Sequence, residues 1–260
     1  MRALWTGSLG FGLVNIPIKI FPAVSEKAVR FNYLHGECEA PVNYQRTCSQ
    51  CGKLVPWDEI IRGYQHEKGH YVTVTDEDVA GLPEKITKTV RILDFVDLAE
   101  IDPIYFRKPY FLVPEQSGVR AYILLRDAMT EMKKVAVAKV VIKGREYLGA
   151  VRVKDSSLLL ETMYFGDEIR DDREFTELEQ EVEPHSKELK MARTLIENLA
   201  TNFDPDRYKD EYREALLSIV HAKVDGTTSG QAEETAQAEV IDLMEALRES
   251  VDKARKKKAG

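Results

Sequence analysis

Four side chains that can ligate a transition metal lie close together near the start of the sequence. They are His35, Cys38, Cys48 and Cys51, spaced as His-x2-Cys-x9-Cys-x2-Cys. Two thiolates three residues apart can bind one Zn²⁺ because the turn between them directs both sulfurs to the same side, and Gly52 permits that turn. The pattern predicts a structural zinc rather than a catalytic one, since four protein ligands leave no open position. Three reduced, partly buried thiols are the alternative interpretation.

Basic residues gather between Ile104 and Lys154, in a chain whose formal net charge is −7. A sheet in which apolar residues alternate with such charges can bury one face and present the other to a polyanion. Charge alone favours a simpler interpretation, in which the bases solvate an exposed sheet face. The stretch holds four acids against eleven bases: Arg107, Lys108, Arg120, Arg126, Lys133, Lys134, Lys139, Lys143, Arg145, Arg152 and Lys154.

Familiar catalytic motifs have little support in the sequence. There is no phosphate-binding glycine loop and no nucleophile elbow. His66 and His70 have the spacing of a His-Glu-x-x-His pair, but they lie beside Gly69 between expected strands rather than on a helix. Asp167 and Glu168 could hold the metal of a nuclease, but one acidic pair is weak support, so we expect no enzyme. No helix with base-reading spacing and no basic zipper is visible either. A nucleic-acid ligand would therefore be contacted through its phosphates, without reading of the base sequence.

Composition limits the remaining classes of protein. The 260 residues are 43% apolar, enough for one large domain with a smaller appendage. No run of about 18 apolar residues occurs, so we expect no membrane partner, and no signal-peptide pattern opens the chain. Three cysteines suit a reducing cytoplasm better than a disulfide framework. Residues 171–260 carry a net charge of −8, which predicts a different role for this part.

Apolar periodicity predicts a β-rich first part. Ile16, Ile18 and Ile20 alternate with polar residues, which favours a half-buried strand, and Pro17 suggests its edge or a bulge. Gly7 and its neighbours Gly10 and Gly12 suggest a close backbone crossing, with a plain loop as the alternative. Helical spacing predicts a helix over 121–132, and a capping box at 75–78 predicts a short helix that stops at Gly81. Further strands are expected at 69–75, 90–96, 110–113, 135–142, 147–153 and 158–165.

The second part reads as helices. Apolar stripes predict one helix over 189–203, a second that follows Asp204-Pro205 and carries Tyr208 to Val220, and a third over 240–251. Residues 225–231 read as a flexible linker. The chain ends with five bases between Lys253 and Lys258, a basic tail.

Ordered blocks of sequence also resemble one family, the prokaryotic Ku proteins. The resemblance covers about residues 1–224 and is specific because many blocks occur in order. The blocks are Trp5–Pro17, Ile61–Tyr64, Glu100–Pro103, Tyr110–Pro114, Asp167–Arg170, Glu188–Ala192 and Asn202–Tyr208.

This resemblance implies a mixed β+α fold, a β-barrel core with a long arch insertion followed by a small helical C-terminal region. Residues 1–180 would form the barrel and arch, with the arch at about 30–71. Residues 181–224 would form the helical region, and 225–260 the linker, amphipathic helix and basic tail. The family's function would be that of a homodimeric ring, without catalysis, that binds double-stranded DNA ends and recruits an ATP-dependent DNA ligase in end joining. A nucleoid-associated, cytoplasmic location follows.

The resemblance is less specific about the roles of single residues. It places Arg46, Lys53 and Arg62 in the arch, with the zinc as a brace there, and Lys143 and Arg145 in a barrel hairpin that meets the DNA backbone. Candidate DNA contacts are Lys19, Arg46, Lys53, Arg62, Arg107, Lys108, Lys139, Lys143 and Arg145. Candidate ligase contacts are Leu189, Leu195, Leu199, Tyr208 and Tyr212. The competing hypothesis is a zinc-stabilised barrel that binds single strands or RNA, which requires exposed aromatic side chains.

Overall fold

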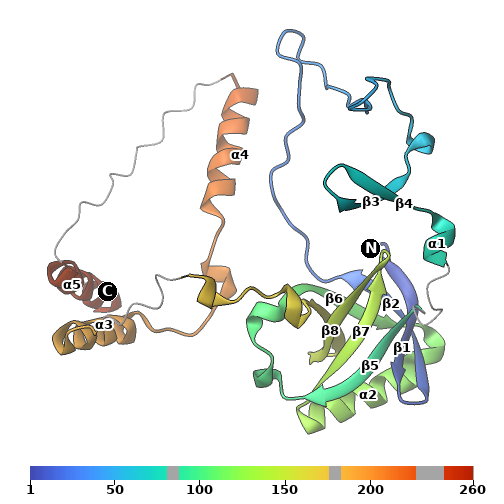
Figure 1. Ribbon diagram of the computed structural model, residues 1–260. Helices are drawn as coiled ribbons and strands as arrows, with labels where there is room; N and C mark the ends of the chain where they lie inside the picture. Colours follow the sequence, from blue (N-terminus) through green and yellow to red (C-terminus); the bar gives the residue numbers. More distant parts are fainter. Residues whose placement is uncertain (81–87, 176–182, 227–242, 260) are drawn as a thin grey trace. The chain divides into compact units, whose positions relative to one another are not determined.

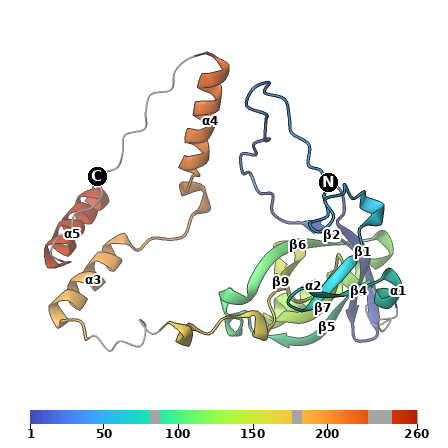
Figure 2. The ribbon, with the colours of Figure 1, turned by 45° about the horizontal axis from the view of Figure 1, so that its top comes forward.

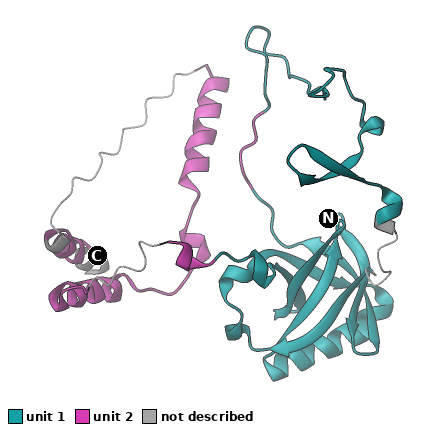
Figure 3. Cartoon of the chain, viewed as in Figure 1, with its two compact units in different colours: residues 1–26, 32–170 teal, residues 27–31, 171–260 magenta. Residues whose placement is uncertain are grey.

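The computed structural model describes residues 1–80, 88–175, 183–226 and 243–259. It divides the chain into two compact units (Figure 3). Unit 1 comprises residues 1–26 and 32–170, and unit 2 comprises residues 27–31 and 171–260. Each unit is described by itself below.

Unit 1 is built on a closed barrel of seven strands in the order β1-β2-β6-β9-β8-β7-β5 (Figure 1). Six neighbouring pairs are antiparallel, and a parallel pair of β1 with β5 closes the barrel. Closure removes the exposed sheet edges that an open sheet of this size would leave. The predicted mixed β+α fold with a barrel is confirmed. The strands are β1 Trp5–Phe11, β2 Val14–Pro22, β5 Thr89–Val96, β6 Phe106–Pro114, β7 Val135–Ile142, β8 Arg145–Lys154 and β9 Ser157–Met163.

Alternate residues of these strands fill the barrel interior. Ile16, Ile18 and Ile20 are fully buried, as their spacing predicts, and Leu112 and Leu160 meet them from β6 and β9. The expectation that Pro17 marks an edge is wrong, because β2 is paired on both sides. The proline is tolerated because the ladder to β6 begins only at Ile18, so no N–H is needed at Pro17 on that side.

Helix α2, Val119–Met132, closes one end of the barrel (Figures 1 and 2). Its buried residues are Tyr122, Leu125 and Met129. The Tyr122 hydroxyl donates to the carbonyl of Leu112 at 2.7 Å and accepts from the N–H of Leu158 at 2.6 Å. Those two groups lie at the end of β6 and the start of β9, so α2 covers that end of both strands. Met132, predicted to share the buried stripe, is instead exposed.

The insertion between β2 and β5 has little regular structure. It holds strands β3 Arg62–Glu67 and β4 His70–Val74, which pair as a hairpin, and helix α1 Asp76–Ala80. Mutual hydrogen bonds between Thr75 and Asp78 confirm the predicted capping box. The expected stop at Gly81 lies outside the described residues. Strand β3 is a correction, since the strand expected in this region covered only 69–75.

Short 3-10 turns connect the regular elements. They span Trp57–Glu59, Leu98–Glu100, Pro103–Tyr105, Gln116–Gly118, Gly166–Glu168, Asp172–Glu174 and Pro205–Arg207.

Unit 2 contains helices α3 Ser186–Leu199, α4 Glu211–Val224 and α5 Leu243–Ala259. Helices α3 and α5 pack together, and Val251 of α5 is 8% exposed. The predicted second helix begins later than expected, because Asp210 rather than Asp204 caps α4 and Tyr208 lies before it. Phe203 likewise follows α3, and the end of the predicted linker, residues 227–231, lies outside the described residues. In the parts that are described, no helix combines the length and hydropathy that a membrane crossing requires.

Candidate nucleic-acid interface

The barrel end opposite α2 is open and basic. The first residues of β6 and β8 meet the last residues of β7 and β9 there, around a cavity of ≈ 140 Å³. We call this the barrel mouth. Among the residues that the structure describes, the cavity lining contains three cations and no carboxylate. Its lining residues are Leu4, Arg107, Lys108, Tyr110, Ile142, Lys143, Tyr147 and Thr162.

A tight hairpin brings Lys143 to the mouth. Ile142 pairs with Arg145, so Lys143 and Gly144 alone form the turn, and both have positive φ, 53° and 79°. Such a two-residue turn matches the twist of the flanking strands. The loop is therefore as short as a hairpin allows, and the predicted position of Lys143 at its tip is confirmed.

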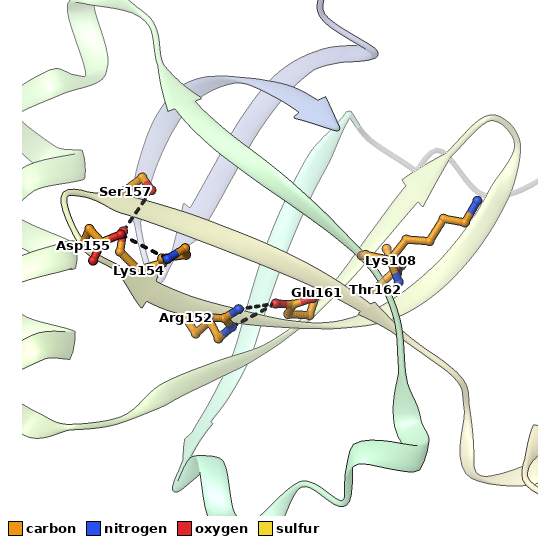
Figure 4. Close-up of polar contacts among 7 residues, drawn as sticks. All are labelled: Lys108, Arg152, Lys154, Asp155, Ser157, Glu161 and Thr162. Carbon is orange, nitrogen blue, oxygen red and sulfur yellow. Dashed lines mark hydrogen bonds and ion pairs between the residues drawn. The ribbon is translucent and has the colours of Figure 1, made fainter. Parts of the chain in front are cut away.

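Lys108 reaches the mouth from β6. It lies on the same face of the strand as Tyr110 and Leu112, the face that lines the interior. Its backbone is held by Thr162, which accepts from the Lys108 N–H at 3.2 Å and donates to the Lys108 carbonyl at 3.0 Å. Figure 4 shows the Lys108 side chain extended away from this pairing. The ammonium group is therefore carried by a fixed backbone.

The ring of Tyr147 contacts the guanidinium groups of both Arg107 and Arg145. The guanidinium carbons of Arg107 and Arg145 each lie 5.3 Å from the centre of its ring, and Arg107 is also 5.6 Å from the ring of Tyr164. Contacts of this kind favour a cation over a ring face and hold its side chain in place. Burial raises the pKa of Tyr110, the neighbouring Tyr147 raises it further, and Arg107 opposes both effects. The Tyr110 phenol therefore stays neutral beside the cations.

Other predicted contact residues on the barrel have acidic partners. Arg145 is paired with Glu168, Lys139 with Glu146 at 3.4 Å, and Lys19 with Glu115 at 3.4 Å. Lys139 also lies 5.7 Å from the ring of Phe165. Lys19 is opposite Val113, near the end of the barrel that α2 covers, so the structure does not bring it to the mouth. Of the described barrel cations on the predicted list, Arg107, Lys108 and Lys143 have no recorded ion pair.

Basic residues elsewhere on β8 differ from those of the mouth because they are paired with acids (Figure 4). Arg152 donates twice to one oxygen of Glu161, at 2.9 and 2.6 Å, and Lys154 pairs with Asp155 at 3.1 Å. Lys154 lies at the far end of β8 from Arg145. Neutralised pairs of this kind attract a polyanion weakly. Among the described residues of the stretch 104–154, bases without an ion pair lie at the mouth (Arg107, Lys108 and Lys143) and on or next to α2 (Arg120 and Lys133).

The predicted arch cations lie on the insertion. Arg46 is 4.5 Å from the ring centre of Trp57, Arg62 is paired with Asp76, and Lys53 is exposed. Stacking on Trp57 leaves the edge of the Arg46 guanidinium open to a phosphate. Their role as DNA contacts stays a prediction.

The predicted zinc ligands form two similar turns. In each, the first ligand residue accepts a hydrogen bond from the residue four positions on: Glu39 N–H to the His35 carbonyl, and Gly52 N–H to the Cys48 carbonyl, both at 2.8 Å. His35 Nδ1 lies 3.2 Å from Cys38 Sγ. Hydrogen bonds from the backbone of Cys51 and then of Gln50 lower the pKa of the Cys48 thiol.

These turns do not meet as one metal site in this structure. Within the described ranges, no group of three or more His, Cys, Asp or Glu side chains could hold one ion. The residues therefore form two donor pairs, and they do not fit a single tetrahedral zinc as they lie. A site would require the turns to approach each other, so zinc stays a prediction. The nuclease hypothesis loses support, because Glu168 pairs with Arg145 and accepts from the Phe165 N–H at 2.9 Å.

The predicted ligase contacts are spread over unit 2. Leu189 and Leu199 of α3 are exposed, whereas Leu195 is half-buried on the stripe that includes Ala192. Tyr208 lies between the helices and stacks on Phe203 at 5.9 Å, and Tyr212 is exposed on α4. The structure therefore leaves apolar and aromatic side chains of this region open to a partner.

Sequence reasoning missed the aromatic part of the mouth. Tyr110 and Tyr147 are each the first residue of an expected strand, 110–113 and 147–153, and neither is a predicted site residue. A ring in the middle of two arginines is not visible in sequence, because Arg107 is 40 positions away from Tyr147. The available signal was the run of Lys143, Arg145 and Tyr147 at alternate positions of one hairpin.

Among the described residues, a closed barrel with a basic and aromatic mouth and no base-reading helix has the features that contact with nucleic acid through its phosphates requires. A profile of the Ku70/Ku80 beta-barrel domain matches residues 10–191. The chain belongs to the Ku family, as the ordered blocks of its sequence indicate.

Relatives support this assignment over nearly the whole chain. The chain is 42% identical over 255 residues to the non-homologous end joining protein Ku of Opitutus terrae, covering 97% of this chain and 92% of the relative. It is 39% identical over 259 residues to the protein of the same name from Bacillus subtilis, covering 98% and 83%. Identity to the Mycobacterium tuberculosis protein of that name is 36% over 266 residues, covering 99% and 97%.

Proposed function

We propose that this chain binds the ends of double-stranded DNA in non-homologous end joining, without sequence specificity and without catalysis of its own. The observation that carries the proposal is the barrel mouth. Arg107, Lys108 and Lys143 converge there with no acidic partner in the described parts of the chain, although the whole protein is acidic. The names of the relatives supply the end-joining context.

We propose further that two copies form a ring. The support lies in residues 32–78, where side chains are almost all exposed, including Tyr64, Tyr71 and Val72 of the β3–β4 hairpin. A two-stranded hairpin with no buried residue is marginally stable in water. Contact with the same element of a second copy would cover it, since two-fold contacts are made by one patch on both subunits.

The helices of unit 2 are proposed to recruit an ATP-dependent ligase. The exposed apolar side chains of α3 and α4 and the stacked pair Phe203 and Tyr208 offer docking groups within unit 2. Exposed apolar clusters of this kind mark protein interaction sites. If these groups bind the ligase, replacing Tyr212 with alanine lowers stimulation of ligation while DNA-end affinity is unchanged.

A binding competition tests the proposed function directly. Radiolabelled linear duplex is bound to the protein, and relaxed closed circles of the same length and sequence compete at matched salt. We expect that linear competitor displaces the label and that circles do so poorly. Affinity should also fall steeply with salt, because each neutralised phosphate steepens the dependence. Equal competition by closed circles would contradict end binding, and stronger competition by single strands would favour the single-strand or RNA hypothesis.

A further inference from the structure

The barrel mouth is a formed cavity rather than a patch of surface charge. Its volume of ≈ 140 Å³ is lined by residues of four barrel strands, of the β7–β8 turn and by Leu4 just before β1, and Thr162 in its wall is 2% exposed. A dispersed basic surface attracts a polyanion from any direction, but a cavity of this size admits only a small group. The geometry therefore selects for shape as well as for charge.

The chemistry of the lining selects an oxyanion. Arg107 supplies a planar fork of N–H donors and Lys108 and Lys143 supply ammonium groups, while Tyr110 and Tyr147 add phenol groups for which no hydrogen bond is recorded among the described residues. Arginine and lysine together with hydroxyl donors are the usual partners of phosphate oxygens. No lining carboxylate competes with such a ligand.

The positions of these donors are set before any ligand arrives. Arg107 is held over two rings, Lys143 is on a two-residue turn, and Lys108 is on a strand fixed by Thr162. Three like charges brought together repel one another, and a bound anion removes that repulsion. Pre-arranged donors bind more tightly because less freedom is lost on binding.

We propose that the barrel mouth is a binding site for one phosphate group, held by Arg107, Lys108 and Lys143. This inference deepens the proposed function, since the phosphate would belong either to the backbone or to the terminus of the bound DNA. The site itself does not depend on that function, because inorganic phosphate presents the same oxygens.

The first experiment uses inorganic phosphate as the probe and the full chain as the protein. Thermal unfolding is followed as phosphate replaces chloride at constant ionic strength. We expect phosphate to raise the midpoint temperature of unfolding, since a ligand that binds only the folded state stabilises that state. Lys143→Asn should weaken phosphate binding by about tenfold, the effect of losing one charged hydrogen bond. Asparagine suits this position because it tolerates positive φ.

Two further variants make the result specific. Lys108→Gln removes a second lining charge but keeps the backbone pairing to Thr162, so it should have the same effect with an intact fold. Lys154→Gln is the matched control, since it also removes one positive charge but at the other end of β8. Absence of stabilisation by phosphate, or an equal loss in Lys154→Gln, overturns the proposal.

The second experiment identifies the source of the phosphate. Duplexes with one open end are compared with a 5′-phosphate or a 5′-hydroxyl. A preference for the phosphate that Lys143→Asn abolishes assigns the site to a terminal monoester. Weaker binding of both duplexes, with the salt slope reduced by about one, assigns it to a backbone diester. If phosphate binds at the mouth but linear and circular DNA compete equally, the proposed function fails and the phosphate site remains.

Discussion

Tyr122 joins helix α2 to the barrel through one hydroxyl group. That hydroxyl bonds to the carbonyl of Leu112 and the N–H of Leu158, and the residue is 4% exposed. Burial raises the pKa of Tyr122, and the Leu158 N–H and Arg126 oppose this in part. A single side chain therefore satisfies two backbone groups that would otherwise be buried without partners.

Replacing Tyr122 with phenylalanine should lower the free energy of unfolding by about 1–3 kcal/mol, because both backbone groups lose their partner. The pH dependence has a definite sign. Because the pKa of Tyr122 is raised in the folded state, the unfolded chain loses the phenol proton first as pH rises above 10. The contribution of Tyr122 to the free energy of unfolding is therefore fully present below pH 10 and falls as pH rises above it. Urea denaturation at neutral and alkaline pH measures both effects. Tyr122→Phe should lose less stability in alkali than the parent, and the exposed control Tyr212→Phe should match the parent.

For single residues, the sequence predicts which face of an element a side chain occupies better than it predicts which distant residues that side chain contacts. Helical spacing places Tyr122 and Leu125 on the buried face, and Gly144 predicts the turn that carries Lys143. Neither the bridge from Tyr122 to two strands nor the ring of Tyr147 between two arginines could be predicted. Both contacts join residues distant in sequence, and only the closure of the barrel brings them together.

The barrel closes where β1 meets β5, and Gly7 makes that closure possible. A Cβ atom at Gly7 would lie 2.2 Å from the carbonyl oxygen of Lys88 and 2.3 Å from the ring of Trp5. The same carbonyl accepts the Ser8 N–H at 2.9 Å, which is the start of the parallel ladder. The close backbone crossing expected from the glycines is thus confirmed, in a strand rather than a loop.

Gly7→Ala should destabilise the protein by about 3 kcal/mol, at the upper end of what overpacking costs, because backbone on the facing strand cannot move aside cheaply. Gly10→Ala is the control in the same strand. Its Cβ would lie 3.3 Å from the methyl group of Thr89 and 3.8 Å from the Val90 carbonyl oxygen, so the loss should stay below about 1 kcal/mol. Chemical denaturation of both variants decides the matter. Similar losses in the two would mean that the crossing does not limit packing.

The paired turns of the insertion carry the zinc prediction. The Cys48-x2-Cys51 spacing correctly predicted a turn there, with Gly52 at a φ of +68°, whereas the similar turn at His35, with Glu39 at +54°, was not predicted. It could not show whether the two pairs meet, because that depends on the nine residues between Cys38 and Cys48.

Cobalt titration under reducing conditions tests for a common site. If the four residues bind one ion, Co²⁺ should give the visible absorption of tetrahedral thiolate coordination, and Zn²⁺ should displace it. Cys51→Ser should then abolish the cobalt absorption and lower the stability of the zinc-bound protein. If the thiols are instead reduced and free, Cys51→Ser should have little effect on stability. A parent protein without cobalt absorption would leave three reduced thiols as the correct interpretation.

Charge is separated over the molecule as a whole. Residues 171–260 hold the negative excess, and Arg107, Lys108 and Lys143 bring unpaired positive charge to the barrel mouth. Affinity for DNA in a protein of net charge −7 must therefore come from local geometry rather than from overall attraction. The sequence showed this division. It could not show which of the eleven bases in 104–154 are neutralised by Glu146, Glu168 and Asp155.

The insertion provides the test of assembly. Tyr64 and Val72 lie directly opposite each other in the β3–β4 hairpin, and they are 69% and 55% exposed. If a second copy covers them, burial of each side chain stabilises the dimer by roughly 1.5–3 kcal/mol. The double variant Tyr64→Ser, Val72→Ser should then raise the dimer dissociation constant by at least about tenfold. Sedimentation velocity over a range of concentrations measures it.

The matched control for this test is Leu124→Ser on α2, an apolar residue 71% exposed. It should leave the dissociation constant unchanged, since α2 lies on the barrel and not on the insertion. A ring needs both copies, so the double variant should bind DNA ends only at protein concentrations high enough for it to dimerise. At lower concentrations, where the parent still saturates the DNA ends, the double variant should bind them poorly. A parent chain that is monomeric at all concentrations, or a double variant that dimerises as the parent does, contradicts the proposed ring.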